Sequence, residues 1–465
     1  MNLAWLALAC AHTPEAPVVD LSTPPSVAAA ADFEPPAPTE TQLSNGLKVW
    51  LLERPGLPLV SLRLVVPGGS AQDIDGQYGA ASLADEALKN GAGERDATAF
   101  AAEVERLALS LGVRTSGSAS IVSLDAHADR LDVGLGLMAD MILRPQFNTE
   151  DVERIKTLQI GALTEAADDP RTLASWALDK QYFGDGHPFA HPTEGTIDTI
   201  KAMNVEDLRA SYIKRYVPDH AVLVVSGDVT SAELIALLEA HLSSWESTGS
   251  TIATVPPPPA HTGGGRHFFV NKPGTSQTAL RIIMPAPATT DDASEAAELG
   301  SIVLGGTFTS RLNRLLREEK GYTYGARASY GGKTNYGYLL ARTNVQRDVS
   351  APALVDLIGA LKTYNGGINE VELGKALGAW QTNVVEAMGS RGAIASTYAS
   401  YAAEGLPRTS LGDGLNKAQA ATIADVNRAA TASQVDEAVV VVVGDLEHIQ
   451  APIEDAIQAD WTVLE

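Results

Sequence analysis

The chain has 465 residues, of which 45% are apolar and 20% charged, a balance typical of globular proteins with enough sequence for roughly two to four domains. Its formal net charge of −23 disfavours nucleic acid as a partner, because the chain would repel a phosphate backbone. A single cysteine excludes an intramolecular disulfide and a cysteine-based metal site, and no apolar run reaches the roughly 20 residues of a membrane-spanning helix.

The N-terminal segment begins with a short apolar stretch that ends at Cys10. A cysteine in this position resembles the processing site of bacterial lipoproteins, although no Lys or Arg precedes the stretch. Residues 11–38 are rich in proline, alanine and threonine, a composition that stays extended and builds no core. We therefore expect residues 1–38 to be a signal and lipid-anchor segment with a Pro-rich tether. The protein would then lie in the bacterial cell envelope, in the periplasm, anchored by a lipid on Cys10.

The rest of the chain is predicted to form two similar domains, residues 39–245 and residues 266–465. Between them, residues 246–265 contain four consecutive prolines and then three glycines, which predicts a linker that is first stiff and then flexible. Each half opens with an alternating strand and closes with a β-branched strand that ends in Gly-Asp. In order, these strands are 59–66 and 221–228 in the first half, and 277–284 and 439–445 in the second. A duplicated unit of about 200 residues accounts for this pattern.

Strands at both ends of each half, with helical patterns between them, predict an α+β fold. In each half, helices would pack on one face of a largely antiparallel sheet.

The first helical pattern covers residues 79–91. Ser82, Asp85, Glu86 and Lys89 share one face, which we expect to be solvated, with Glu86 and Lys89 as a weak ion pair. The opposite, buried stripe consists of Ala80, Leu83, Ala84, Ala87 and Leu88.

A second helix is predicted over residues 149–167, capped by Thr149 and stopped before Pro170. Its apolar face would include Leu158 and Ala162. Farther on, His187 and His191 are four residues apart, but a proline follows each of them. Since proline interrupts a helix, the one-turn geometry of a metal-binding histidine pair is not expected there.

Together these motifs resemble the insulinase/pitrilysin/mitochondrial processing peptidase family. In that family the first helix reads roughly G-x-A-H-x-x-E-H, with two zinc-binding histidines one turn apart and a glutamate as the general base. Aligned without a gap, Ser82 stands in place of the first histidine, Asp85 in place of the glutamate and Glu86 in place of the second histidine. The family's third ligand is a glutamate, and counting back from Pro170 places Ala162 there.

The resemblance therefore implies an inactive member with no catalytic residues and no metal or other cofactor of its own, its metal positions being degenerate. The alternative from the residues is an unusual metal site built from Asp85, Glu86 and Glu165. Glu165 and Glu153 lie on the helix of the third ligand, but about one turn or more from its place.

A second familial motif lies in the second half. Residues 316–324 match the pattern L-R-x-x-x-G-x-x-Y, with Arg317 and Tyr324 at the family's spacing. In active relatives this arginine and tyrosine reach across a closed chamber toward the substrate and the oxyanion. The resemblance implies that Arg317 and Tyr324 bind substrate. The alternative is a surface role, with Arg317 paired to Glu318 or Glu319.

The resemblance also implies a clamshell half. Loss of the zinc motif beside an intact Arg/Tyr motif suggests the non-catalytic subunit of a heterodimeric zinc peptidase. Its partners would be a zinc-bearing subunit of the same family and short or unfolded peptides. Two alternatives remain open: a stand-alone peptide-binding or scaffold protein at a bacterial membrane surface, and an active metallopeptidase with a rebuilt metal site.

Overall fold

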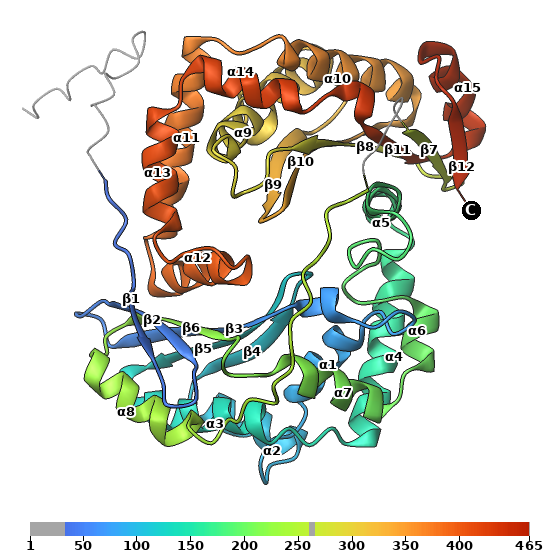
Figure 1. Cartoon of the computed structure of the whole chain (residues 1–465). Coiled ribbons are helices and arrows are strands. Elements are labelled where there is room, and N and C mark those ends of the chain that lie inside the picture. Colours follow the sequence, from blue (N-terminus) through green and yellow to red (C-terminus); the bar gives the residue numbers. More distant parts are fainter. Residues whose placement is uncertain (1–32, 260–265, 465) are drawn as a thin grey trace, which may run out of the picture. The chain divides into compact units, whose positions relative to one another are not determined.

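The computed structural model describes residues 33–259 and 266–464, so Cys10 and the glycines of the linker lie outside the described residues. Two six-stranded sheets form the framework, and each takes all its strands from one half of the chain (Figure 1). Both sheets are mixed with mainly antiparallel neighbours, which confirms the predicted α+β fold. Within the described ranges, no helix combines the length and the apolarity needed to cross a bilayer.

The first sheet has the strand order β1-β2-β6-β3-β5-β4. Neighbouring strands are antiparallel except for β2 and β6, which run parallel. Along β3, Val60, Leu62 and Leu64 point into a large apolar core, whereas Ser61 and Arg63 alternate toward the opposite face. The strands are β1 (Thr39–Gln42), β2 (Lys48–Glu53), β3 (Leu59–Pro67), β4 (Ser110–Thr115), β5 (Ala119–His127) and β6 (Val222–Gly227).

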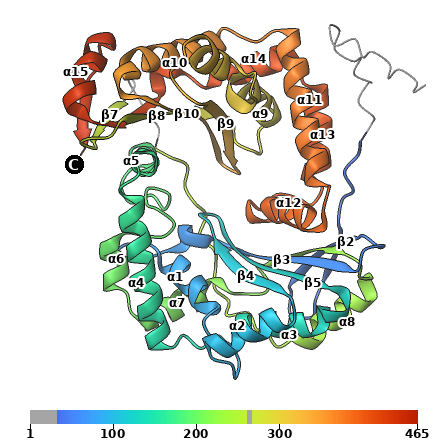
Figure 2. The same ribbon diagram turned by 180° about the vertical axis from the view of Figure 1, so that it is seen from behind.

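Helices of the first half cover the apolar face of this sheet, as Figure 2 shows from behind. They form because their apolar residues recur with helical spacing, and polar caps such as Asn204 satisfy the first free N–H groups. The helices are α1 (Ala80–Leu88), α2 (Ala97–Arg106), α3 (Leu131–Leu143), α4 (Thr149–Ala166), α5 (Pro170–Phe183), α6 (Ile197–Ala202), α7 (Val205–Arg215) and α8 (Ser231–Leu242), with short 3₁₀ turns η1 (Gly69–Gln72) and η2 (Ala128–Arg130).

The second sheet has the order β12-β7-β11-β8-β10-β9. Its last five strands follow the same order as β2-β6-β3-β5-β4, which supports the predicted duplication. The edges differ, because β12 runs parallel to β7 whereas β1 runs antiparallel to β2. The strands are β7 (Arg266–Asn271), β8 (Gln277–Ala286), β9 (Ala326–Lys333), β10 (Tyr336–Gln346), β11 (Val439–Gly444) and β12 (Trp461–Leu464).

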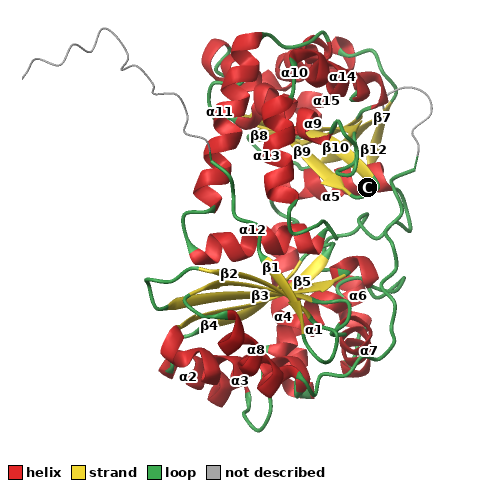
Figure 3. Cartoon of the chain, turned by 60° about the vertical axis from the view of Figure 1, so that its left-hand side comes forward, coloured by secondary structure: helices red, strands yellow, loops and turns green. Residues whose placement is uncertain are grey.

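In the second half, too, helices form the main cover of the sheet (Figure 3). They are α9 (Ser294–Ser301), α10 (Ser350–Asn365), α11 (Glu370–Ala387), α12 (Arg391–Ala403), α13 (Ser410–Ala420), α14 (Ile423–Ala432) and α15 (Leu446–Ala456), with π-helical turns η3 (Ile302–Gly306) and η4 (Asn313–Glu319) and 3₁₀ turns η5 (Arg347–Val349) and η6 (Val435–Glu437).

The two halves exchange one helix each, a feature that the sequence did not predict. Helix α12 packs on β3 and β6, where Ser396 accepts a hydrogen bond from Arg63. Helix α5 packs on β8 and β11, with Ala174 and Leu178 buried against the second sheet. Each sheet thus carries a helix of the other half on the face that its own helices leave free (Figure 1).

The described part of the linker is bonded to both halves. The Gln72 side chain donates to the Ala253 carbonyl at 2.9 Å and accepts from its N–H at 3.0 Å. On the other side, Asn335 donates to the Val255 carbonyl at 2.8 Å. These bonds fix the residues that lead into the proline run.

Helix α4 corrects two details of the predicted second helix. Its N-cap is Asn148, and Thr149 is its first helical residue. Leu158 and Ala162 are exposed, so they do not belong to the buried face, which instead includes Val152, Ile155 and Leu163. The predicted stop before Pro170 is confirmed, and Pro170 begins the next helix.

Candidate functional site

Helix α1 carries three of the four positions where the family resemblance places zinc-site residues. It begins at Gly79, whose φ of 94° and close approach to the Glu194 carbonyl exclude a side chain. The Asp73 carboxylate accepts from the N–H groups of Gly79 and Ala81, both at 2.8 Å, and so caps the helix. Burial raises the pKa of Asp73 to about 6, against the lowering effect of these two N–H groups and of Arg215.

Asp85 is not on a solvated face, which corrects the expectation from sequence. It is 1% exposed and forms a buried ion pair with Arg215 of α7 at 2.9 Å. The same carboxylate accepts from the Thr115 hydroxyl at 2.6 Å and from the Tyr216 hydroxyl at 3.0 Å. Both carboxylate oxygens are therefore engaged by internal donors.

Arg215 is also held from several sides. Its guanidinium donates to Ser120 Oγ at 2.6 Å and to the Ala81 carbonyl at 3.3 Å. Burial is the largest single influence on the pKa of Arg215 and lowers it, but the charge and hydrogen bond of Asp85 together with the charges of Tyr216 and Asp73 outweigh burial, so the pKa lies above its ordinary value. Burial raises the pKa of Tyr216 well above the ordinary value, which keeps its hydroxyl a donor to Asp85. The position of the family's general base is thus part of a closed polar network.

Ser82 and Glu86 lie at the edge of a cavity of about 690 Å³. The cavity is lined from both halves, because Ser400 and Glu404 belong to the end of α12 and its following residue. Glu86 pairs with Lys89 at 2.6 Å, which confirms the predicted ion pair. A polar chamber therefore lies over the degenerate zinc motif.

These residues do not fit zinc. Zinc needs three or four nitrogen, sulfur or carboxylate ligands in tetrahedral geometry. At the three ligand places stand the Ser82 hydroxyl, the Glu86 carboxylate that is paired with Lys89, and the Ala162 methyl group, which is exposed on α4. Both oxygens of Asp85, which stands for the general base, already accept hydrogen bonds from internal donors.

The carboxylates of the alternative metal site are not grouped as ligands either. Glu165 is exposed on α4, and Glu153 pairs with Lys156 at 3.0 Å. In the part of the chain that the structure describes, one set of three possible metal ligands has its ligand atoms within 4.8 Å of one another. This set lies near the C-terminus and consists of Asp445, Glu447 and His448. The expectation that the chain holds no metal of its own stays a prediction.

Arg317 and Tyr324 lie in the second half, and both are exposed. Arg317 belongs to η4, and its guanidinium lies 4.4 Å from the centre of the Phe308 ring, a cation–π arrangement. Among the described residues, neither Glu318 nor Glu319 forms an ion pair with Arg317. Glu319 instead contacts Arg314 at 3.7 Å. Tyr324 is 89% exposed. Both side chains of the predicted substrate-binding pair are thus presented to solvent, and within residues 33–259 and 266–464 neither forms an ion pair or a side-chain hydrogen bond.

The backbone beside Tyr324 is nevertheless fixed. Thr323 donates through its hydroxyl to the Asn344 carbonyl at 2.7 Å and to the Gly325 carbonyl at 3.0 Å. Thr343 of β10 donates to the Thr323 hydroxyl at 3.0 Å. The loop thus holds an exposed tyrosine on an ordered base.

His187 and His191 have structural roles in the fold. Nε2 of His187 lies 2.9 Å from the Pro256 carbonyl of the linker, and Nδ1 accepts from the Phe189 N–H at 3.0 Å. His191 stacks on Tyr78 with a centroid distance of 3.5 Å. Burial lowers the pKa of both histidines, so both favour the neutral form.

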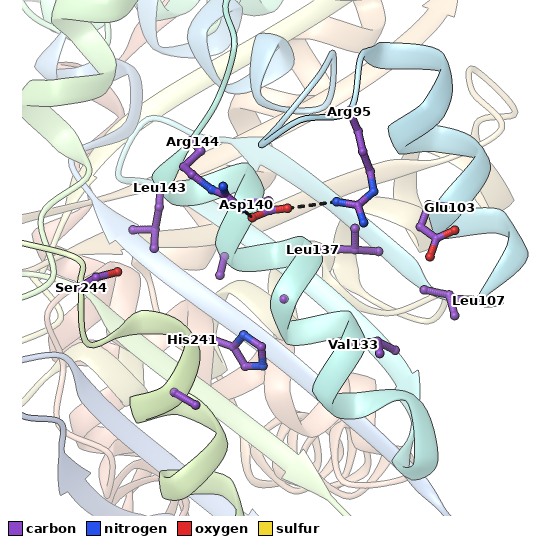
Figure 4. Close-up of a pocket in the computed structure, with 13 residues that line it drawn as sticks. Arg95, Glu103, Leu107, Val133, Leu137, Asp140, Leu143, Arg144, His241 and Ser244 are labelled. Carbon is purple, nitrogen blue, oxygen red and sulfur yellow. Dashed lines mark hydrogen bonds and ion pairs between the residues drawn. The ribbon is translucent and has the colours of Figure 1, made fainter.

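A second cavity, of about 750 Å³, is lined by residues of α2, α3 and α8 and of the adjoining loops. Figure 4 shows Asp140 between Arg95 and Arg144, and it pairs with both. His241 of the same cavity contacts Asp132 at 2.7 Å. Each charged side chain that lines this cavity has an ion-pair partner among the described residues, so none of them is an obvious group for binding a charged ligand.

Arg215 was missed at the sequence level. Its segment, 212–228, is part of the family resemblance, but no local pattern shows that an arginine 130 positions after Asp85 pairs with it. Because Arg215 ends a polar helix, the sequence does not distinguish this buried arginine from an exposed one.

Comparison with known proteins gives two family matches. The family described as Insulinase (Peptidase family M16) matches residues 48–185, and the Peptidase M16 inactive domain matches residues 202–377. A crystal structure of a peptidase M16 inactive domain from Pseudomonas fluorescens is 25% identical, with a TM-score of 0.81 over 88% of this chain and 98% of that one.

Two curated relatives have different names. An uncharacterised zinc protease of Mycobacterium leprae is 26% identical over 61% of this chain, and the match spans 64% of that protein's length. A non-peptidase homologue of Helicobacter pylori is 25% identical over 65% of this chain and 69% of that protein. Similar sequences thus include proteins named as peptidases and proteins named as non-peptidases.

Proposed function

The chain belongs to the insulinase (M16) peptidase family, and on this premise we propose that it is a non-catalytic subunit of a heterodimeric zinc peptidase. It would bind peptides and contribute substrate-binding residues to the active site of a zinc-bearing partner of the same family. The observation that carries the proposal is the Asp85–Arg215 ion pair. It places an internal salt bridge where a peptidase of this family needs a free general base.

What remains of a peptidase supports a binding role. A chamber of about 690 Å³ persists over α1 and is lined by polar groups of both halves. Arg317 and Tyr324 are exposed and keep the family spacing. An arginine fork can hold a peptide carbonyl, and a tyrosine hydroxyl can stabilise an oxyanion. In the proposed heterodimer, these groups would act on a peptide at the zinc that the partner chain supplies.

The proposal extends to location. An acyl chain on Cys10 would tether the protein to a membrane of the bacterial cell envelope, and the subunit would work in the periplasm. Incorporation of labelled palmitate into the wild-type chain and its loss in Cys10→Ser test this part. Labelling that persists in Cys10→Ser would contradict the anchor.

Affinity purification from a native membrane extract tests the function. We expect a chain of similar size that carries H-x-x-E-H to co-purify in equal amount, with zinc-dependent peptide hydrolysis by the complex. If the protein is recovered alone and still binds peptides, the stand-alone binding or scaffold function replaces the heterodimer. If the isolated chain hydrolyses peptides, the non-catalytic role is wrong.

A further inference from the structure

A third cavity, of about 450 Å³, is lined by four arginines. It lies between α5 and the second sheet and is distinct from the chamber over α1. The arginines come from α5 and from three strands that are adjacent in the sheet. They are Arg171 on α5, Arg281 on β8, Arg342 on β10 and Arg327 on β9.

Strand register brings three of these arginines into one row. Arg342 is directly opposite Arg281 on one side and Arg327 on the other. Directly opposite residues of antiparallel strands point to the same face of the sheet. Like charges in such positions destabilise a sheet, so the row costs stability unless an anion lies between the guanidinium groups.

No carboxylate in the described residues forms an ion pair with Arg281, Arg327 or Arg342. Arg171 alone is neutralised, by Asp169 at 2.9 Å. Arg281 is 5% exposed, and its Nε has no hydrogen-bond partner. One of its terminal nitrogens donates to the Leu280 and Thr343 carbonyls, both at 2.9 Å, which fixes the group in place. Burial, and then the charge of Arg342, lowers the pKa of Arg281 to about 10.

The duplicated fold supplies an internal comparison. Arg63 on β3 corresponds to Arg281 on β8, and it makes the same bond to the carbonyl of the preceding residue, at 2.8 Å. However, Arg63 pairs with both oxygens of Asp125, at 3.1 and 3.2 Å. In the first half the chain itself supplies a carboxylate that pairs with the arginine. In the second half, no carboxylate of the described residues forms an ion pair with Arg281, and Asp169 acts on it only through its charge.

We propose that this arginine cavity binds a carboxylate of the peptide held by the subunit, so that the subunit selects acidic peptides. The inference rests on the proposed function, because it names the class of peptide. Arginine forks match the two oxygens of a carboxylate, and the hydroxyl of Thr172 on the same wall adds a donor. The loop of Tyr324 adjoins the cavity through Gly325, so a carboxylate bound there would lie near this predicted peptide-binding residue.

The net charge of the whole molecule favours binding of acidic peptides at this one site rather than over the surface in general. A chain with a net charge of −23 repels acidic peptides over most of its surface. A local row of unpaired arginines reverses this repulsion at one place. Nucleic acid is disfavoured, since a single cavity of about 450 Å³ offers no extended basic track for a backbone.

The test uses the full chain and a fluorescent 12-residue peptide in four forms: with Glu or Gln at its centre, and with a free or an amidated C-terminus. We expect a carboxylate form to bind about tenfold more tightly than its neutral match at low salt, with the difference shrinking at higher ionic strength. Preference for Glu assigns the site to a side chain, and preference for the free acid assigns it to the peptide's end.

Arg327→Gln with Arg342→Gln is the informative variant. Both side chains are exposed, so the fold should persist, whereas a change at buried Arg281 could unfold the sheet. The double variant should bind all four peptides as weakly as the wild type binds the fully neutral peptide. Arg130→Gln changes an exposed arginine of the first half and should leave all four affinities unchanged. Equal binding of all forms by the wild type would overturn the inference and leave peptide binding intact. No binding of any form would overturn both.

Discussion

A general base must hold a free lone pair toward the water that it activates. Asp85 accepts hydrogen bonds from three internal donors, and Arg215, Thr115 and Tyr216 together engage both of its oxygens. It is also shielded from solvent at 1% exposure. Asp85 is therefore suited to a structural role and not to that of a catalytic base. Arg215, which neutralises it, is equally buried.

Asp85→Asn should destabilise the protein by about 3–5 kcal/mol, because it leaves the buried Arg215 charge without its counter-ion. Lys89→Gln is the matched control on the same helix. It breaks the half-exposed pair with Glu86 and should cost less than about 1 kcal/mol. Urea unfolding of the two variants and the wild type measures both changes. Equal free energies of unfolding for Asp85→Asn and wild type would contradict the structural role.

Arg317→Ala should lower peptide hydrolysis by the purified heterodimer about tenfold or more, since an arginine that touches the substrate acts on the transition state. The complex itself should stay assembled. Arg314→Ala, which removes a neighbouring exposed arginine of η4 that contacts Glu319, is the control and should leave turnover unchanged. Turnover that is insensitive to Arg317→Ala would exclude its substrate role.

At the scale of elements, the exchanged helices connect the two halves. Helix α5 buries Ala174, Leu178 and Tyr182 in a cluster with β8 and β11. The same helix carries Asp179, for which the described residues provide neither an ion pair nor a hydrogen bond. Burial raises the pKa of Asp179 to about 7. This carboxyl group is therefore tolerated in the interface chiefly in its neutral form.

Protein stability should consequently fall as pH rises from about 4 to about 7. The unfolded chain releases the proton of Asp179 near its ordinary pKa of 3.8, whereas the folded chain retains it until about 7. The full loss is at most about 4 kcal/mol, at about 1.4 kcal/mol for each pKa unit. Asp179→Asn should flatten this decline and raise the melting temperature at pH 8, while exposed Asp460→Asn should not. A decline of unchanged slope in Asp179→Asn would show that another group causes it.

Elements with local signals could be predicted from the sequence. The strand around Leu62 and the strand around Leu280 alternate apolar residues, and Pro170 marks a helix boundary by its own stereochemistry. The exposure of Leu158 could not be predicted, because a helical stripe does not reveal which neighbour covers each residue. The exchange of α5 and α12 depends on contacts between distant segments, for which periodicity gives no signal.

The residues of the candidate site likewise fall into those that the sequence could predict and those that it could not. Motif spacing located Ser82, Glu86, Arg317 and Tyr324 on exposed or half-buried surfaces where a ligand can reach them. The partner of Asp85 lies 130 positions away, so its burial required the structure. The row of arginines around Arg342 likewise depends on strand register, which composition does not define.

At the scale of the whole molecule, two copies of one architecture have diverged in their chemistry. The first keeps a chamber over α1 but fills the base position with a salt bridge, and it neutralises Arg63 with Asp125. The second presents Arg317 and Tyr324 and leaves Arg281 without a carboxylate. This division is what a subunit requires if it holds a peptide while another chain supplies the zinc and the base.

The zinc content of the purified proteins tests this account most directly. Elemental analysis of the isolated chain, after dialysis against a weak chelator, should give far less than one zinc per chain. The co-purified heterodimer should retain one zinc per pair. One tightly held zinc in the isolated chain, accompanied by peptide hydrolysis, would contradict the account, because Ser82, Asp85, Glu86 and Ala162 would then have to belong to a working metal site.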